Sequence, residues 1–256
     1  MLKYIANTNR KPANIKVSVA VQHPMKVRIR AIDPHKKGAV YLDRWATVKQ
    51  AEDFEIRLPQ SPEKLLIKIS SPQLNGNKDA VKVDLNKIKL PQHLPCLSGK
   101  RVSAFLKFAK KFSENAGILS AGRYKSDNGK YTIDYLPTIK HGGRELTTPA
   151  RISNQTGRME ISQKYFVSMS IPMRMAILCH EFSHFYLNEV QKDEIEADLN
   201  ALTMYLGMGY PVIEAHKAFL KTFHNSPSKV NKERYTYLKK FIDNFDKLKY
   251  EICFPN

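Results

Sequence analysis

The sequence predicts an α+β fold in two parts: an N-terminal antiparallel β-sandwich over residues 1–90 and a second domain over residues 91–256. Three observations support this prediction. Hydrophobic and polar residues alternate through the first third, the pattern becomes helical after residue 99, and a segment with two prolines, residues 89–99, separates the two patterns. With 256 residues, 42% of them hydrophobic, the chain can bury a core in each part.

The first part is expected to consist of short strands with one buried face. Five segments have the period of two that such strands require, at residues 16–21, 27–32, 54–58, 65–70 and 81–85. Segments rich in proline, glycine and asparagine separate several of them, which favours tight turns in a sandwich. No pattern in this part points to chemistry, so we expect a docking or structural role.

The second part is expected to begin with a helix over residues 102–116 that ends at Gly117. Two hairpins follow, with turns at residues 127–129 and 156–157, and residues 159–162 form a candidate edge strand. A last helix is expected over residues 234–250, with a core-facing stripe made of Tyr237, Phe241, Phe245 and Leu248.

The chain is strongly basic, with 42 lysines and arginines against 24 acidic residues and a net charge of +18. Residues 1–90 carry 18 basic and 8 acidic residues, so the excess is slightly denser there. Such a charge favours a polyanionic partner, DNA or an acidic protein surface, although solubility alone is an equal alternative. No helix-turn-helix signature, paired C-x-x-C or aromatic-basic motif supports a nucleic-acid-binding module.

The cysteines and the apolar segments indicate the cellular compartment in which the protein is expected. Cys96, Cys179 and Cys253 are far apart and odd in number, which argues against a disulfide framework or a thiolate zinc cluster. The N-terminus has no apolar run typical of a signal peptide, and the most apolar helical stretch carries Arg174. We therefore expect a cytoplasmic protein that makes no membrane contact.

The segment AILCHEFSHFYLN, residues 176–188, carries the clearest chemical pattern. In a helix capped by Ser170, His180 and His184 lie one turn apart and can reach one metal ion, with Glu181 leaning toward the same side. This HExxH spacing is typical of two zinc ligands followed by a carboxylate that takes a proton from metal-bound water. The alternative is an ordinary buried helix with two partly buried histidines.

A third ligand is available on the next helix, which Asp193 can cap and which ends near Gly207. Glu194 would complete a site of two histidines and one glutamate with a fourth position open to water. Asp198 lies four residues later on the same face and could accept the free ring N–H of a ligand histidine. Glu196 points away, so Glu194 is preferred as the third ligand and Glu196 remains the alternative.

The residues HEFSH followed by EIEAD resemble the gluzincin metallopeptidases, among them thermolysin and the prenyl-protein proteases, whose pattern is HExxH with a downstream ExxxD. The resemblance covers residues 102–210 and implies a zincin-like metallopeptidase domain within residues 91–256. It implies Zn²⁺ held by His180, His184 and Glu194, Glu181 as general base, and a protein or peptide substrate. It departs from thermolysin in the connection from His184 to Glu194, which has only nine residues and must be one tight turn.

Peptide hydrolysis also needs a donor to the developing oxyanion, usually a tyrosine, histidine or arginine. The downstream candidates are Tyr210, His216, His224 and Arg234, and the sequence does not select among them.

The same stretch is also similar to small zincin-like proteins of tailed phages of gut Bacteroides, the crAss-like group. That resemblance implies a virion or assembly role in the neck, ring or tail region, within the host cytoplasm or the virion. The basic sandwich would then contact a neighbouring subunit or packaged DNA. Two function hypotheses follow: a zinc metallopeptidase, or a structural component of a larger assembly whose zincin fold is active or inactive.

Overall fold

The computed structural model describes residues 1–74, 78–90, 94–225 and 228–248. It has an α+β fold, which confirms the predicted class. The chain divides into two compact units, one made of Met1–Pro91 with Gly209–Pro211, and the other of Gln92–Met208 with Val212–Asn256.

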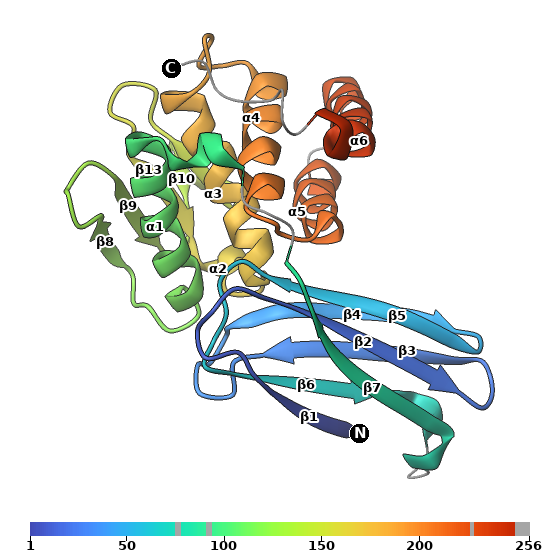
Figure 1. The fold of residues 1–256 in the computed structure, drawn as a ribbon. Helices are drawn as coiled ribbons and strands as arrows, with labels where there is room; N and C mark the ends of the chain where they lie inside the picture. The colour runs from blue at the N-terminus through green and yellow to red at the C-terminus, as the bar shows by residue number, and fades with distance from the viewer. Residues whose placement is uncertain (75–77, 91–93, 226–227, 249–256) are drawn as a thin grey trace. The chain divides into compact units, whose positions relative to one another are not determined.

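The first unit contains two antiparallel sheets, seen as the blue and teal strands of Figure 1. One sheet has the order β1 (Leu2–Asn7), β6 (Lys64–Ser70), β3 (Met25–Ile32) and β4 (Val40–Val48). The other has the order β5 (Ala51–Leu58), β2 (Ala13–Val21) and β7 (Val81–Ile88). Two short 3-10 helices, η1 (Pro72–Leu74) and η2 (Lys78–Ala80), precede β7.

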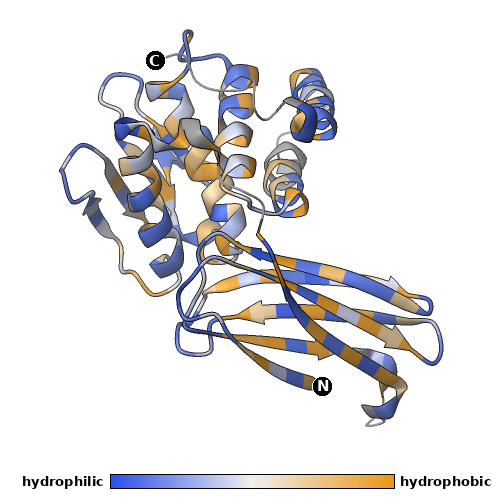
Figure 2. Ribbon diagram, viewed as in Figure 1, coloured by the Kyte–Doolittle hydropathy of each residue, from blue (hydrophilic) through white to orange (hydrophobic). Residues whose placement is uncertain are grey.

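Alternation of residue types explains these strands, and Figure 2 shows it as alternating orange and blue along the ribbons. Every second side chain of the inner strands is buried, including Val17, Val27, Ile29 and Ile67, which are 0% exposed. The five predicted strands are confirmed with wider bounds. The strands β1 and β4 were not predicted because they are edge strands whose alternation is interrupted by exposed Ile5 and Trp45.

The second unit contains a four-stranded sheet in the order β12 (Ala150–Ile152), β13 (Met159–Ser162), β9 (Thr132–Leu136) and β8 (Gly122–Lys125). Both predicted hairpins are present, and β13 pairs in parallel with β9. The prediction that residues 159–162 form an edge strand is wrong, because β13 lies between β12 and β9. That parallel pairing joins distant segments, so no local pattern reveals it. Strands β10 (Lys140–His141) and β11 (Arg144–Glu145) form a small separate ribbon.

The helices of the second unit are η3 (Pro95–Ser98), α1 (Lys100–Asn115), α2 (Gln163–Phe166), α3 (Ile171–Tyr186), α4 (Glu194–Gly207), α5 (Val212–Asn225) and α6 (Lys229–Leu248). The predicted caps are confirmed: Ser170 accepts the N–H of Met173, and Asp193 accepts those of Ile195 and Glu196. No described helix has the length and apolar character needed to span a membrane. The helix α5 was not predicted.

The predicted core stripe of the last helix is wrong in one position. Tyr237 is 53% exposed, whereas its neighbour Leu238 is 2% exposed and Phe245 is buried. Leu238 therefore takes the place of Tyr237 on the buried face, and that face begins with a buried charged residue, Arg234, which a hydrophobic pattern does not predict. The side chain of Leu248 lies outside the described residues.

Helix α3 is the centre of the second unit and packs against α1, α4, α5 and β12. Its aromatic side chains fix this packing, since Phe182 stacks on Phe105 with 4.0 Å between ring centroids. The turn between β12 and β13 comes so close to α3 that a Cβ at Gly157 would lie 2.7 Å from the Tyr186 hydroxyl. Gly157 also has a φ of +66°, so both space and backbone conformation require glycine there.

Arg174 lies fully buried in α3 and holds three helix ends together through its guanidinium. It donates to the carbonyls of Phe166 at 2.9 Å, Ser113 at 2.8 Å and Val167 at 3.2 Å. Burial lowers the pKa of Arg174 to about 10, which leaves it charged at neutral pH.

We predict that Arg174→Met lowers the free energy of unfolding by about 3 kcal/mol, because it leaves buried carbonyls without these donors. Chemical denaturation followed by circular dichroism measures the change. Arg144→Met, which removes an exposed arginine of β11, should have a much smaller effect. Equal effects of the two substitutions would show that the buried hydrogen bonds of Arg174 do not stabilise the unit.

Candidate metal centre

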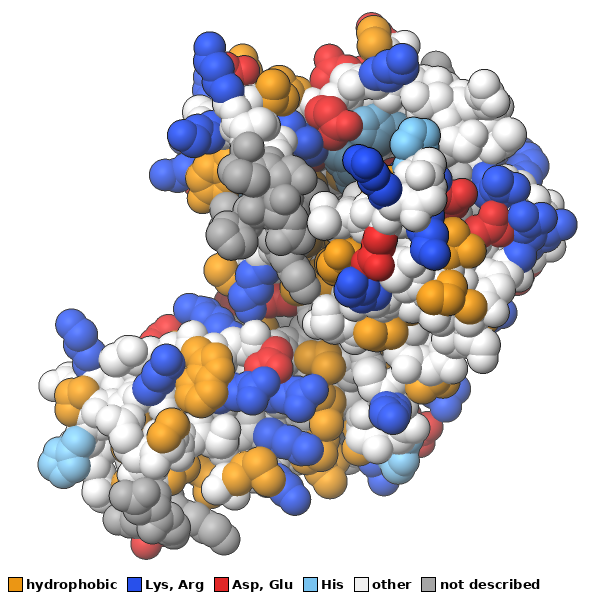
Figure 3. All heavy atoms as spheres, turned by 180° about the vertical axis from the view of Figure 1, so that it is seen from behind, with side chains coloured by type: hydrophobic (Ala, Val, Ile, Leu, Met, Phe, Trp, Pro, Cys, Tyr) orange, Lys and Arg blue, Asp and Glu red, His pale blue; other side chains and the backbone are white. Residues whose placement is uncertain are grey.

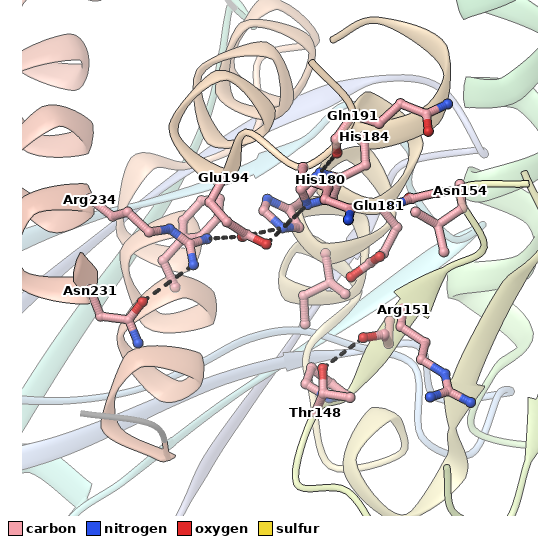
Figure 4. Close-up of a pocket in the computed structure, with 16 residues that line it drawn as sticks. Thr148, Arg151, Asn154, His180, Glu181, His184, Gln191, Glu194, Asn231 and Arg234 are labelled. Atoms are coloured by element: carbon pink, nitrogen blue, oxygen red, sulfur yellow. Dashed lines mark hydrogen bonds and ion pairs between the residues drawn. The ribbon is translucent and has the colours of Figure 1, made fainter. Parts of the chain in front are cut away.

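Helix α3 brings His180, Glu181 and His184 to the wall of one cavity (Figure 4). The two histidines are one turn apart, so their rings lie one above the other. The distance between their Nε2 atoms is 3.1 Å. Two imidazole nitrogens that face each other this closely can share one metal ion.

Glu194, in the first turn of α4, brings a carboxylate to the same point. Its oxygens lie 3.5 Å from Nε2 of His180 and 3.6 Å from Nε2 of His184. Within the described residues, the donor atoms of these three side chains all lie within 4.8 Å of one another. Glu196 is directed elsewhere, since its carboxylate accepts the backbone N–H groups of Glu189 at 2.9 Å and Val190 at 3.4 Å. The structure therefore brings Glu194, and not Glu196, to the two histidines.

The short connection between α3 and α4 is held by side chains. The Asn188 amide donates to the carbonyl of Asp193 at 2.8 Å and accepts from the Asn200 amide at 3.1 Å. Together with the two hydrogen bonds to Glu196, these contacts fix the turn from both sides. A connection of nine residues is thus sufficient to bring Glu194 back to His184.

Both histidine rings are oriented through their Nδ1 atoms. Nδ1 of His180 lies 2.9 Å from a carboxylate oxygen of Asp198, and Nδ1 of His184 lies 2.7 Å from the carbonyl oxygen of Gln191. These partners favour a proton on Nδ1 and leave Nε2 of each ring facing the site. The spacing of Asp198 predicted its contact with a histidine ring. The contact of the Gln191 carbonyl was not predicted, because every residue has a backbone carbonyl and the residue type therefore does not indicate it.

Arg234 extends from α6 into the site and contacts the carboxylates of both Asp198 and Glu194. Its guanidinium contacts both oxygens of Asp198, at 2.8 and 3.0 Å, and lies 3.0 Å from Glu194. Of the four residues considered as oxyanion donors, Arg234 lines the cavity, while Tyr210 and His216 do not. The side chain of His224 lies outside the described residues. Arg234 is a positioning residue here, since it holds Asp198 and Glu194 in place.

Glu181 is 8% exposed and lies beside the three donors without joining them. The backbone N–H of Ile152 in β12 donates to its carboxylate. Burial raises the pKa of Glu181 to about 7, with a smaller contribution from the negative charge of Glu194. A carboxylate with such a pKa can both accept and release a proton near neutral pH.

The charges at the three donors favour a cation. Burial opposes the protonated form of His180, but hydrogen bonds to Asp198 and Glu194 outweigh it and raise the pKa of this ring. The pKa of Glu194 is lowered, because contacts with His180 and Arg234 outweigh its partial burial. Burial and the nearby His180 lower the pKa of His184. The pocket thus stabilises one positive charge next to a neutral imidazole.

The donor set fits zinc, which binds imidazole nitrogen and carboxylate oxygen in tetrahedral sites. Three donors converge from two helices, and both rings have the outer hydrogen-bond partners that metal-bound histidines use. The cavity in front of them has a volume of about 420 Å³, so space remains for a water molecule and a substrate group.

We predict that Asp198→Asn weakens zinc binding by about 10–100-fold, because it removes the negative charge beside His180 and one of the two carboxylates that contact Arg234. Competition with a chromophoric chelator measures the affinity. Asp193→Asn on the same helix is the matched control, since asparagine also caps a helix N-terminus. Unchanged affinity in Asp198→Asn would mean that this carboxylate does not support the site.

Comparison of the chain with protein-family models, with curated proteins and with solved structures finds no match. We therefore infer the function from the geometry of the site.

Proposed function

We propose that the chain is a zinc metallopeptidase of the gluzincin type, in which His180, His184 and Glu194 hold the metal ion. The observation that carries the proposal is the convergence of these three donors in one cavity, with Glu181 buried beside them. An ordinary buried helix would not need three metal-ligating groups directed at one point, nor two rings fixed by outer partners.

The number of protein donors favours a catalytic role for the ion. Structural zinc sites are closed by four protein ligands, whereas catalytic sites have three and leave one position open. Three donors facing an open cavity correspond to the second arrangement. A zinc ion bound there would supply polarisation of the scissile carbonyl and activation of a water molecule.

Glu181 is the residue proposed to move the proton. Its carboxylate receives a proton from the attacking water and later passes it to the leaving amine. A pKa near 7 suits both steps, because neither form of the group is strongly favoured at neutral pH. The Ile152 N–H keeps the carboxylate directed into the cavity.

Strand β12 is the proposed docking edge for the substrate, in place of residues 159–162. It lies at the end of its sheet, and Ala150, Arg151 and Ile152 all line the cavity. The Ile152 N–H is occupied by Glu181, so an extended peptide could add to this edge through the remaining main-chain groups of Ala150 and Ile152, which would place one peptide bond beside Glu181.

The test combines metal analysis with cleavage of a denatured general substrate. The proposal expects about one zinc per chain, loss of cleavage on chelation and its recovery when zinc is restored. The protein could instead bind zinc but cleave neither that substrate nor neighbouring proteins. This result would support the alternative function, a structural component of a larger assembly. Absence of zinc binding would contradict the metallopeptidase.

A further inference from the structure

The positive charge of the first unit is concentrated on one of its two sheets. The strands β1, β6, β3 and β4 carry one acidic residue, Asp43, against seven basic residues: Lys3, Lys26, Arg28, Arg30, Arg44, Lys64 and Lys68. The strands β5, β2 and β7 carry four basic and four acidic residues. Since solubility alone would not load only one sheet of a sandwich, this asymmetry points to a ligand.

The cross-strand register places like charges directly opposite one another. Lys3 of β1 is paired with Lys68 of β6, and Lys68 is paired with Arg30 of β3. Directly opposed like charges destabilise a sheet. Asp43 offsets part of the repulsion, through contacts of 2.8 Å with Arg28 and 3.4 Å with Arg30. An anion bound along the row formed by Lys3, Lys68 and Arg30 would remove the remaining electrostatic repulsion.

Trp45 lies on the same face, opposite Arg28 in the register. It is the only tryptophan of the chain, and 46% of it is exposed. The ring centroid lies 5.3 Å from the Lys26 ammonium and 5.7 Å from the Arg28 guanidinium. A large exposed aromatic ring flanked by cations on a sheet is the combination that proteins use to stack unpaired bases.

Figure 3 shows a face of the sandwich on which lysine and arginine side chains gather, with hydrophobic side chains among them and few acidic ones. On the face built from β1, β6, β3 and β4, an exposed isoleucine, Ile5, stands opposite Leu66. The surface is therefore both cationic and partly apolar, which suits a ligand with charged and aromatic parts.

We propose that the outer face of the sheet β1, β6, β3 and β4 binds single-stranded nucleic acid. The phosphates lie along Lys3, Lys68 and Arg30, and a base stacks on Trp45. Single strands are favoured over duplexes because stacking on a side chain requires a base that is not already stacked in a helix. An acidic protein surface would use the cations but gives no role to the exposed ring. The proposal is independent of the metal centre.

Trp45 supplies its own probe, because all tryptophan emission of this 256-residue chain comes from this position. We expect an oligothymidylate of about 20 nucleotides to quench the emission, with strong salt dependence. An oligouridylate of equal length tests whether RNA binds as well. Polyglutamate of similar charge should bind more weakly and quench less. Oligothymidylate binding without quenching, or equal binding of polyglutamate, would overturn the proposal, and the second result would favour an acidic protein partner.

Two variants test the aromatic and the cationic parts of the surface separately. Binding of labelled oligothymidylate to each is measured by fluorescence anisotropy. Trp45→Ala should weaken binding by about tenfold. Lys3→Ser with Lys68→Ser should reduce the slope of log affinity against log salt by about 1.4, since two phosphate contacts are lost.

The matched control is Lys82→Ser with Lys87→Ser, which removes two exposed lysines from β7 on the other sheet. The control should leave the salt slope unchanged. Equal effects of the two lysine pairs would overturn the proposal, because net charge alone would then explain binding. Thermal unfolding shows whether each variant is folded. The variant with Lys3→Ser and Lys68→Ser should not have a lower unfolding temperature than the wild type, because it removes opposed like charges.

Discussion

Glu181→Gln is expected to lower the rate of peptide cleavage by about 10²–10⁴-fold while zinc stays bound. The amide has the shape of the carboxylate and can still accept from the Ile152 N–H, but it cannot take a proton from water. Glu181 does not join the three converging donors, so its replacement leaves the metal ligands in place. Cleavage of a quenched fluorescent peptide mixture and zinc analysis of the same samples measure the two properties separately.

Glu196→Gln is the matched control for this substitution. One carboxylate oxygen of Glu196 accepts the backbone N–H of Glu189 at 2.9 Å and the other accepts that of Val190 at 3.4 Å, and the amide oxygen of glutamine can keep the shorter of these two hydrogen bonds. The control should retain both zinc and activity. If Glu181→Gln remained as active as the control, Glu181 would not be the general base.

His184→Ala is expected to reduce the zinc content from about one per chain to near zero, and to abolish cleavage with it. The substitution removes one of the two imidazole donors and leaves Glu194 and His180 without the third member of the set. Zinc should also stabilise the wild-type protein against heat, because the ion binds the folded state, and this stabilisation should vanish in the variant. Metal analysis after dialysis and thermal unfolding with and without zinc measure both effects.

His216→Ala is the corresponding control on α5. His216 is a partly buried histidine that does not line the cavity, and its ring packs near Tyr235. Retention of zinc by this variant would show that the loss in His184→Ala is specific to the site. A His184→Ala protein that kept the zinc-dependent stabilisation would exclude His184 as a ligand.

The sequence was most informative where function depends on local helix geometry. The spacing of His180 and His184, the caps at Ser170 and Asp193, and the common face of Glu194 and Asp198 all follow from 3.6 residues per turn. These features need no knowledge of the remaining fold, and the structure contains them.

Features that depend on distant segments were predicted poorly. The position of β13 inside its sheet follows from parallel pairing with β9, and the selection of Arg234 follows from the docking of α6 against α4. The cationic row on the first sheet needs the register of β1, β6 and β3, of which β1 was not predicted. A charged residue that is buried, such as Arg174 or Arg234, also runs against the hydrophobic pattern on which such predictions rest.

The most direct test of the metal centre is anomalous diffraction at the zinc absorption edge from crystals of the purified protein. The proposal predicts a peak about 2.0–2.2 Å from Nε2 of His180, Nε2 of His184 and a carboxylate oxygen of Glu194, with Glu181 beside it but not bound. Crystals grown with zinc that show no peak at these three side chains, or show the ion held by other residues, would contradict it.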